Sequence, residues 1–196
     1  MTEKGRNRAE IVYEDNSSNC PLLVVIHSIS VSADWFSATG KALSSEKKNV
    51  RYIGLKHKDV SFAISLTEHD SVQLLDDDSR EKSGSETYYE RKCDALFDID
   101  GRGNTERLVA RNPKLKNLLK DGEYIPSLGQ LNLMAHYMDE LNKAFAYVSA
   151  SPLSSTWYRS STESSPSVAW YVDFSIGSAY YSDKYNSSRV RAVIDF

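Results

Sequence analysis

Cysteine is scarce in this chain of 196 residues, which has only Cys20 and Cys93. The two stand far apart and match no spacing at which cysteines bind a metal. They could form one disulfide or be two buried thiols, and we favour two free cysteines. We expect no metal and no cofactor.

Long apolar runs are also missing, and no segment reaches the roughly 20 apolar residues that span a membrane as a helix. The first ten residues are charged and carry no apolar core of a signal peptide. These two absences predict no direct membrane insertion. The interpretations that remain are a non-secreted protein, a virion component or a chain trimmed of its leader.

Positive charge is not in excess, because 24 Lys and Arg stand against 27 Asp and Glu, for a net charge of -3. This balance argues against attraction to nucleic acid or to an anionic membrane. The length fits one domain, or one domain with a tail. We expect a polar N-terminal arm over residues 1–20 and one domain over residues 21–196.

What the chain does contain predicts an α+β fold. Residues 22–26 are a β-branched run typical of a buried strand, and residues 50–55 and 61–66 predict two strands paired through a hairpin loop at 57–59. A helix over 105–111 is predicted, with Asn104 or Thr105 as its cap. A longer helix over 128–147 follows the capping box of Ser127 and Gln130. We therefore expect a twisted antiparallel sheet, two helices and extensive irregular loops.

Residues 98–104 resemble the opening of a calcium loop, since Asp98, Asp100 and Asn104 supply oxygens with Gly101 and Gly103 between them. The fifth position is Arg102, however, and the twelfth, Val109, replaces the closing glutamate. A tight turn before a helix is the better interpretation.

The last forty residues interleave two populations of side chains. Large apolar residues alternate strictly with polar ones between Trp170 and Phe174, which predicts a strand with one buried face. We expect a core of Trp170, Val172, Phe174, Val190 and Val193. The second population is mostly Tyr, Ser, Asp and Asn, the composition of an antibody paratope. An ordinary serine-rich loop system with tyrosines on strand faces is the alternative.

Arg189 and Arg191 are two residues apart on a predicted strand and therefore share a face. We expect at least one to pair with a carboxylate, with Glu163 as the first candidate, because a bare buried charge is costly. The alternative is an exposed cationic edge that discourages aggregation between strands.

Three stretches in order give the chain a family resemblance: residues 98–105, residues 124–131, and the C-terminal series 160–163, 169–174 and 189–193. Together they resemble the C-type-lectin-fold variable proteins of diversity-generating retroelements, which occur among surface proteins and phage tail proteins of gut Bacteroides-type bacteria. The resemblance covers roughly residues 31–196, and it departs at Arg159, where the family usually has Trp.

The resemblance implies that a reverse transcriptase diversifies residues 157–196, while Trp170, Phe174, Gly177, Lys184, Arg189 and Arg191 look like fixed scaffold. It implies a ligand-binding and adhesion function at the bacterial cell surface or on a phage virion, with a cell-surface protein or glycan as partner and self-association left open. The implied ligand-binding residues, expected to lie on exposed surface, are Tyr158, Ser164, Ser165, Ser167, Val168, Tyr171, Asp173, Ile176, Ser178, Tyr180, Tyr181, Ser182, Asp183, Tyr185, Asn186 and Ser187.

Other functions compete with ligand binding. A structural fimbrial or phage tail subunit is the first alternative. Related domains also include formylglycine-generating enzymes, but those use a cysteine pair in the substrate groove, and no catalytic motif positions the serines and histidines here. We therefore expect no enzyme. A calcium-dependent lectin is not favoured, because Glu-Pro-Asn and Gln-Pro-Asp are absent from the sequence.

Overall fold

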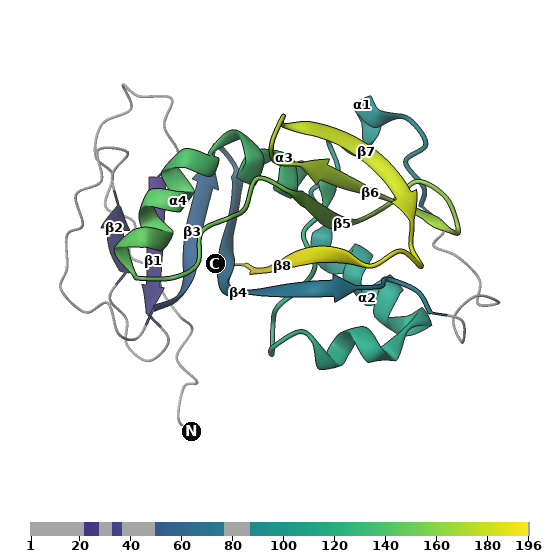
Figure 1. The fold of residues 1–196 in the computed structure, drawn as a ribbon, viewed down its shortest axis with the longest axis horizontal. Helices are drawn as coiled ribbons and strands as arrows, with labels where there is room; N and C mark the ends of the chain where they lie inside the picture. The colour runs from purple at the N-terminus through teal and green to yellow at the C-terminus, as the bar shows by residue number, and fades with distance from the viewer. Residues whose placement is uncertain (1–21, 28–32, 37–49, 77–86, 196) are drawn as a thin grey trace. The chain divides into compact units, whose positions relative to one another are not determined.

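The computed structural model describes residues 22–27, 33–36, 50–76 and 87–195 (Figure 1). These residues fall into two compact units. Unit 1 contains the described residues up to Leu66, residues 139–152 and the chain end from Ile194, and unit 2 contains residues 67–138 and 153–193. The predicted arm over residues 1–20, which includes Cys20, lies outside the described residues.

Unit 1 is built on antiparallel strands. Its strands are β1 (Leu22–His27), β2 (Ala33–Phe36), β3 (Val50–His57) and the first part of β4 (Val60–Val72), in the order β2-β1-β3-β4. The β3–β4 hairpin is confirmed, with His57 paired to Val60 across a two-residue turn in which Lys58 has a φ of 52°. Two-residue hairpin loops need such positive φ angles because their twist then matches that of the strands.

Among the described side chains of unit 1, the buried ones come from the hairpin and from helix α4 (Met138–Tyr147). Ile53, Leu55, Phe62 and Ile64 are fully buried on β3 and β4, and α4 buries Leu141, Ala144 and Phe145. Burial of a large aliphatic or aromatic side chain contributes about 1.5–3 kcal/mol each before the entropy cost.

Unit 2 has a mixed sheet of the end of β4 with β5 (Trp157–Glu163), β6 (Val168–Asp173), β7 (Ser178–Asp183) and β8 (Ser188–Ile194), in the order β4-β8-β5-β6-β7. The β5–β6 and β6–β7 pairs are antiparallel, but β8 runs parallel to β5. The expected antiparallel sheet is therefore wrong for this pair. Parallel neighbours need a long connection, and here the chain passes through β6 and β7 before β8 returns beside β5.

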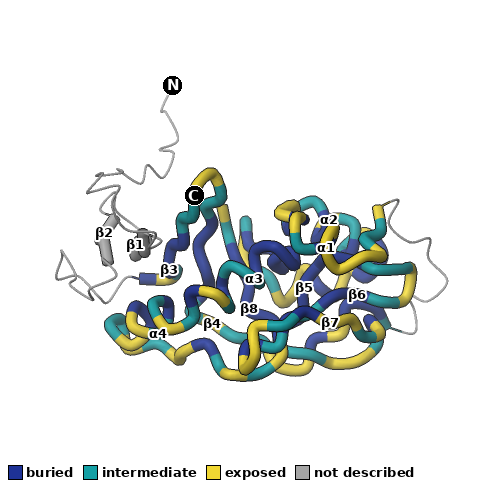
Figure 2. Tube along the Cα trace, turned by 90° about the horizontal axis from the view of Figure 1, so that it is seen from above, coloured by how far each residue is buried: buried dark blue, intermediate teal, exposed yellow. Residues whose placement is uncertain are grey.

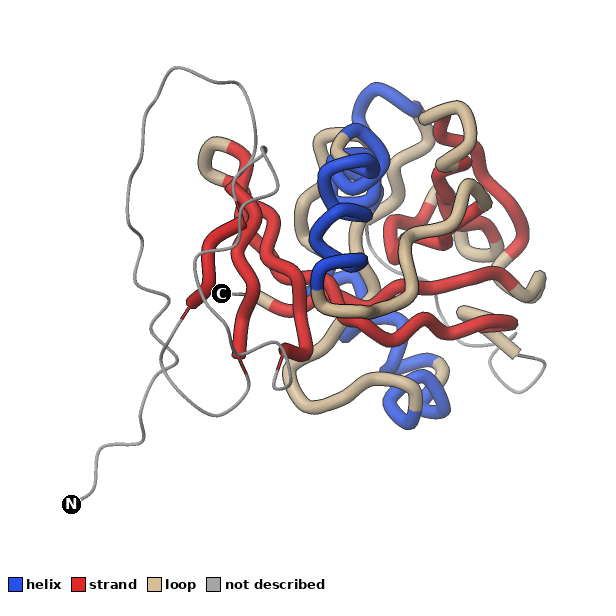
Figure 3. The backbone as a smooth tube through the Cα atoms, turned by 60° about the vertical axis from the view of Figure 1, so that its left-hand side comes forward, coloured by secondary structure: helices blue, strands red, loops and turns tan. Residues whose placement is uncertain are grey.

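The described part of the chain contains four α-helices and one 3-10 helix, so the expectation of two helices is too low. Figure 3 shows the helices in blue among the strands. Besides α4 these are α1 (Lys92–Ala95), α2 (Gly101–Arg111), η3 (Pro113–Asn117) and α3 (Leu128–His136). With only four residues, α1 is too short to give a periodic pattern in the sequence.

The predicted helix over residues 128–147 is wrong as a single element, because the chain leaves helical geometry at Tyr137, between α3 and α4. In an unbroken helix, the nine residues from Leu128 to Tyr137 would make roughly two and a half turns. The two side chains would then lie on opposite faces of the helix. Both side chains are buried in the structure. Helical spacing of the apolar residues did not reveal this break.

The two predicted helix starts have different outcomes. The capping box is confirmed: the Ser127 hydroxyl accepts from the Gln130 backbone N–H, and the Gln130 side chain accepts from the Ser127 N–H. The start of α2 is wrong, because Asp100 is its cap and accepts from the Gly103 N–H at 2.9 Å. Asn104 and Thr105, the predicted caps, lie within α2 and are buried.

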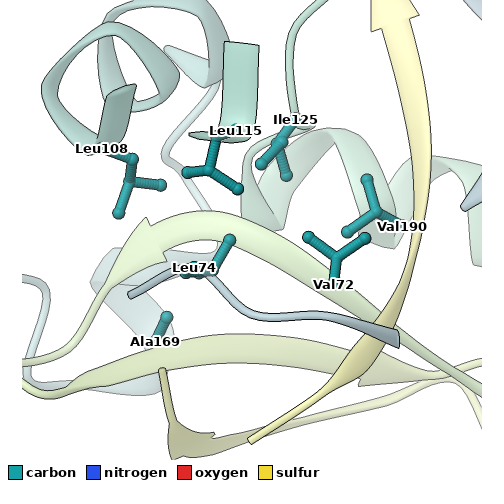
Figure 4. Close-up of a cluster of buried hydrophobic side chains, with 7 residues drawn as sticks. All are labelled: Val72, Leu74, Leu108, Leu115, Ile125, Ala169 and Val190. Atoms are coloured by element: carbon teal, nitrogen blue, oxygen red, sulfur yellow. The ribbon is translucent and has the colours of Figure 1, made fainter. Parts of the chain in front are cut away.

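The predicted C-terminal core is confirmed, since Trp170, Val172, Phe174, Val190 and Val193 are each 5% exposed or less. One buried cluster joins segments far apart in the sequence: it contains Val72, Leu74, Leu108, Leu115, Ile125, Ala169 and Val190 (Figure 4). Burial alternates from Trp170 to Phe174 and gives way to exposed residues in the β6–β7 turn. Figure 2 shows buried and exposed segments along the backbone.

Candidate ligand-binding surface

Three aromatic side chains from adjacent strands form a continuous row on one face of the unit 2 sheet. We call Trp157 of β5, Tyr171 of β6 and Tyr180 of β7 the aromatic row. The Trp157 and Tyr171 rings lie 5.3 Å apart between centroids, and those of Tyr171 and Tyr180 lie 5.9 Å apart, with planes 30° and 28° apart. Their strand positions explain this, because Tyr171 is directly opposite Tyr180 and lies two residues before Asp173, the partner of Trp157.

The aromatic row is open to solvent at both ends. Trp157 is 57% exposed and Tyr180 is 46% exposed, with Tyr171 half-buried between them. Burial raises the Tyr171 pKa from its ordinary value, so its hydroxyl stays protonated and able to donate a hydrogen bond near neutral pH. Exposed aromatic side chains offer a large contact area at a low entropy cost.

Charged groups flank the aromatic row. At one end, the Asp173 carboxylate accepts from the Trp157 indole N–H at 2.8 Å and from the Ser175 hydroxyl and N–H. The hydrogen bond from the Ser175 hydroxyl lowers the pKa of Asp173 most. At the other end, the Lys92 ammonium lies 5.8 Å from the centre of the Tyr180 ring. The row therefore combines aromatic surface with both signs of charge.

Arg159 lies beside the row, opposite Tyr171, as a buried cation that is 1% exposed, with its guanidinium 5.9 Å from the Tyr171 ring centre. It donates to main-chain carbonyls, among them those of Ala169 and Ser182 at 3.2 and 3.1 Å. Burial lowers the pKa of Arg159 to about 10, so the group is charged at neutral pH. At this position, where the resembled family usually has Trp, the side chain serves as a hydrogen-bond donor to the sheet.

The residues predicted to bind ligand are almost all accessible. Seven are exposed and eight are half-exposed. The exposed ones are Ser167, Ile176, Tyr180, Tyr181, Asp183, Asn186 and Ser187. The half-exposed ones are Ser164, Ser165, Val168, Tyr171, Asp173, Ser178, Ser182 and Tyr185. Ile176 stands before Gly177, whose φ of 63° makes the β6–β7 turn.

Tyr158 is the exception, and its placement on an exposed patch is wrong. Its side chain is fully buried, packs 4.6 Å from the Phe174 ring centre, and donates a hydrogen bond to Glu68 at 2.5 Å. Tyr158 is adjacent to Trp157 on β5, and neighbouring strand residues point to opposite faces. Trp157 therefore takes the solvent side that was expected for Tyr158.

The expectation of one patch is also wrong, because β7 presents its tyrosines on two faces. Tyr180 lies in the aromatic row, whereas Tyr181 is opposite Trp170 and packs edge-on against that ring at 5.3 Å. β7 is the last strand in the order of unit 2, so Tyr181 is exposed at the edge of the sheet while facing the other way.

Trp157, Lys92 and Arg159 belong to this site but were not predicted from the sequence. A tyrosine-rich composition pointed only to Tyr158 and later residues. The alternation of Trp170, Val172 and Phe174 could have found Trp157 if the pairing of β5 with β6 had been known, because Trp157 is opposite Asp173. The contact of Lys92 joins residues 88 positions apart and leaves no local pattern.

The predicted pairing of the two C-terminal arginines is confirmed, but the proposed partner is wrong. Arg189 pairs with Asp70 at 2.7 Å and with Glu68 at 3.1 Å, and the fully buried Arg191 lies 3.6 Å from Glu68. Both carboxylates lie on β4, the strand next to β8. Glu163 is on β5 and pairs with Arg111 and Lys184 instead.

Glu163 instead holds two buried cations. One of its oxygens accepts hydrogen bonds from both Arg111 and Lys184. The Lys184 ammonium also donates to the carbonyls of Ser165 and Pro166 at 2.7 and 2.8 Å. Burial lowers the pKa of Lys184 to about 8, although the carboxylate of Glu163 opposes that shift.

The segment that resembles a calcium loop uses its oxygens within the protein. The Asp98 carboxylate accepts from Asn104 at 2.7 Å and from Thr162 at 2.6 Å. The Asp98 carbonyl accepts from the Gly129 N–H and the Ser127 hydroxyl. Among the described residues no cluster of three or more His, Cys, Asp or Glu could hold a metal. Asp98 thus ties the start of α2 to α3 and β5.

The thiol of Cys93 is free, as favoured from the sequence, but it is exposed, so the alternative of a buried thiol is wrong for this residue. It accepts from the Arg91 guanidinium at 3.2 Å, at the start of α1.

No helix in the described part of the chain is long and apolar enough to cross a membrane.

No protein-family model matches the chain, and no curated protein matches it. Among solved structures, the chain is similar to a fimbrial protein from Bacteroides ovatus, with 18% sequence identity and a TM-score of 0.59. The match covers 83% of this chain and 48% of the fimbrial protein, so this chain spans about half of the neighbour's length. At this identity the likeness shows the fold alone, and that fold is α+β.

Proposed function

We propose that this chain is a surface protein of fimbrial type from a Bacteroides-type bacterium, acting as a structural subunit or domain of a surface appendage. The observation that carries this proposal is the shared fold with the fimbrial protein over 83% of the chain. The test is location: antibodies to the chain should label intact cells of the source bacterium and copurify with sheared appendages. Labelling only after lysis would overturn it.

The aromatic row supports a second function, ligand binding at the surface of unit 2. A monomer rarely keeps several large aromatic side chains exposed together unless something docks on them. Trp157 and Tyr180 are such residues, and Tyr171 and Asp173 lie beside them. We propose a binding role without catalysis, with a cell-surface protein or glycan as partner and no nucleic acid. Self-association through the same surface would make the partner a second copy of the chain.

The binding proposal is tested with immobilised mucin glycoprotein, before and after enzymatic removal of its glycans. The double variant Trp157→Ala, Tyr180→Ala should lose at least about tenfold in affinity, since aromatic hot spots each contribute about 2 kcal/mol or more. The control is Tyr181→Ala, on the other face of β7, which should bind normally. Binding that survives deglycosylation indicates the protein as ligand. Equal affinity of the double variant and the wild type would show that the row is not the site.

A finer proposal is that the fold is C-type-lectin-like and that a retroelement diversifies the exposed residues of 157–196. Its support is the composition of the accessible surface: the seven exposed predicted residues are Tyr, Ser, Asp, Asn and Ile, whereas Trp170 and Phe174 are buried. The test is in the DNA. A near-identical template repeat beside the gene, differing only at adenines, is expected, and a gene neighbourhood without one would reject diversification.

A further inference from the structure

The main-chain carbonyls where β7 leads into β8 accept hydrogen bonds from residues elsewhere in the chain. We call residues 182–187 the recognition loop. Arg159 donates to three of its carbonyls, those of Ser182 at 3.1 Å, Asp183 at 3.2 Å and Asn186 at 3.5 Å. It also donates to the Ser188 hydroxyl at 3.0 Å. One buried side chain therefore spans the whole loop.

The remaining carbonyls between Ser182 and Asn186 are held by the segment after β4. The backbone N–H groups of Leu74 and Leu75 donate to the Lys184 carbonyl at 3.0 and 3.3 Å. The Gln73 side chain donates to the Tyr185 carbonyl at 2.6 Å. Each of the five carbonyls from residue 182 to residue 186 thus accepts a hydrogen bond from a residue outside the loop.

The loop side chains reach solvent, with one exception, and two of them also bond within the loop. The Asp183 carboxylate accepts from the Tyr185 N–H at 2.9 Å, and the Asn186 amide donates to the Ser182 hydroxyl at 3.2 Å. Asp183, Asn186 and Ser187 are exposed and Tyr185 is half-exposed. Lys184 is the exception: it is fully buried, and it anchors the loop to Glu163 and to the carbonyls of Ser165 and Pro166. Main-chain bonds do not depend on side-chain identity, so a backbone held in this way can carry different side chains.

Resting on the proposed ligand binding, we infer that Arg159 and Gln73 are positioning residues that fix the recognition loop, and that Tyr185, Asn186 and Ser187 determine which ligand is bound. The buried guanidinium costs desolvation and has carbonyl oxygens instead of a carboxylate as its described hydrogen-bond partners. Several charge-assisted bonds to carbonyls stabilise such a group. The loop backbone is therefore held by Arg159 and Gln73 from outside, in addition to the bonds that Asp183 and Asn186 make within the loop.

The first experiment measures loop order without any ligand. Arg159→Lys shortens the side chain and removes the planar fork, and Arg191→Lys is a matched control, since Arg191 is equally buried but pairs with Glu68 instead of the loop. Amide hydrogen exchange across residues 182–188 should accelerate by roughly tenfold or more in Arg159→Lys and stay unchanged in Arg191→Lys. Gln73→Ala, an exposed and milder change, should accelerate exchange in the same peptide and leave Tm unchanged.

The second experiment measures specificity. Ser187→Tyr should keep the wild-type Tm and the wild-type exchange of residues 182–188, yet shift relative affinities for native and deglycosylated mucin. Arg159→Lys should weaken binding to both forms together, because the backbone that presents the side chains is lost.

These two readouts separate the inference from the function on which it rests. Faster exchange in Arg159→Lys together with no mucin binding by the wild type would retain the positioning role and reject this ligand. Unchanged exchange in both Arg159→Lys and Gln73→Ala would overturn the positioning role, as would equal acceleration in Arg191→Lys. Loss of Tm in Ser187→Tyr would show that the loop depends on the side chain at this position.

Discussion

The Tyr158 hydroxyl donates a hydrogen bond to Glu68 across 90 positions of sequence, at 2.5 Å. It also accepts from the Ser154 N–H at 2.9 Å, and burial raises the Tyr158 pKa from its ordinary value. Glu68 is at the same time the partner of Arg189 and Arg191. One hydroxyl therefore completes a small charged network between β4, β5 and β8.

Removing that hydroxyl should cost stability. Tyr158→Phe should lower the free energy of unfolding by about 1–2 kcal/mol, because the partly buried carboxylate of Glu68 loses a donor. Tyr180→Phe is the matched control and should change it by no more than about 0.5 kcal/mol, as is usual at an exposed position. Urea titration at neutral pH measures both. Equal effects would place Tyr158 at the surface after all.

Glu163→Gln should be far more damaging. The change leaves Arg111 and Lys184 buried with no carboxylate between them, and breaking a buried ion pair costs about 3–5 kcal/mol. Asp76→Asn removes the carboxylate that pairs with the exposed Lys114, and should cost about 1 kcal/mol or less. If the two variants unfold at the same denaturant concentration, the Glu163 cluster contributes nothing beyond a surface pair.

The lowered pKa of Lys184 predicts that the stability of the protein rises with pH. Its pKa is about 8 in the folded chain against an ordinary value of 10.5, because burial disfavours the charged form. Between these values the unfolded chain binds more protons, so the free energy of unfolding increases as pH rises from about 8 to about 10.5. Urea titrations across this window should show the increase in the wild type relative to Lys184→Met. A parallel pH dependence in both proteins would refute the prediction.

The register of β6 can be tested at its C-terminal end. Phe174→Ala should cost about 3–5 kcal/mol, mostly as a cavity beside Tyr158. Ile176→Ala, two residues later in the exposed turn, should cost about 0.5 kcal/mol or less. Thermal or urea unfolding distinguishes the two, and a reversed order would contradict the assigned register.

Local patterns predicted the features that depend on neighbouring residues. The alternation around Trp170, the hairpin that ends β3 and the capping box at Ser127 each need only a few adjacent side chains, and all three are present. Pairings between distant segments were not predictable in this way. Whether Glu163 pairs with Arg191 or with Lys184 depends on which strands become neighbours.

The same limit explains the errors in the candidate site. Composition identified tyrosines and serines that are accessible, but it could not assign Tyr180 and Tyr181 to opposite faces without the register of β7. For the same reason, Tyr158 instead of Trp157 was predicted to be exposed. A single residue of register decides which of two neighbours is buried.

The interior position of β8 has a consequence for folding kinetics. In unit 2 this strand lies between β4 and β5, although residues 188–194 follow every other strand in the chain. During synthesis on a ribosome, the edges of β4 and β5 that pair with β8 would therefore stay unpaired until β8 emerges. The ion pair of Arg189 with Asp70 closes a loop of 119 positions, and such non-local contacts slow folding. Nascent chains that stall before residue 188 should thus be the most aggregation-prone species of this protein.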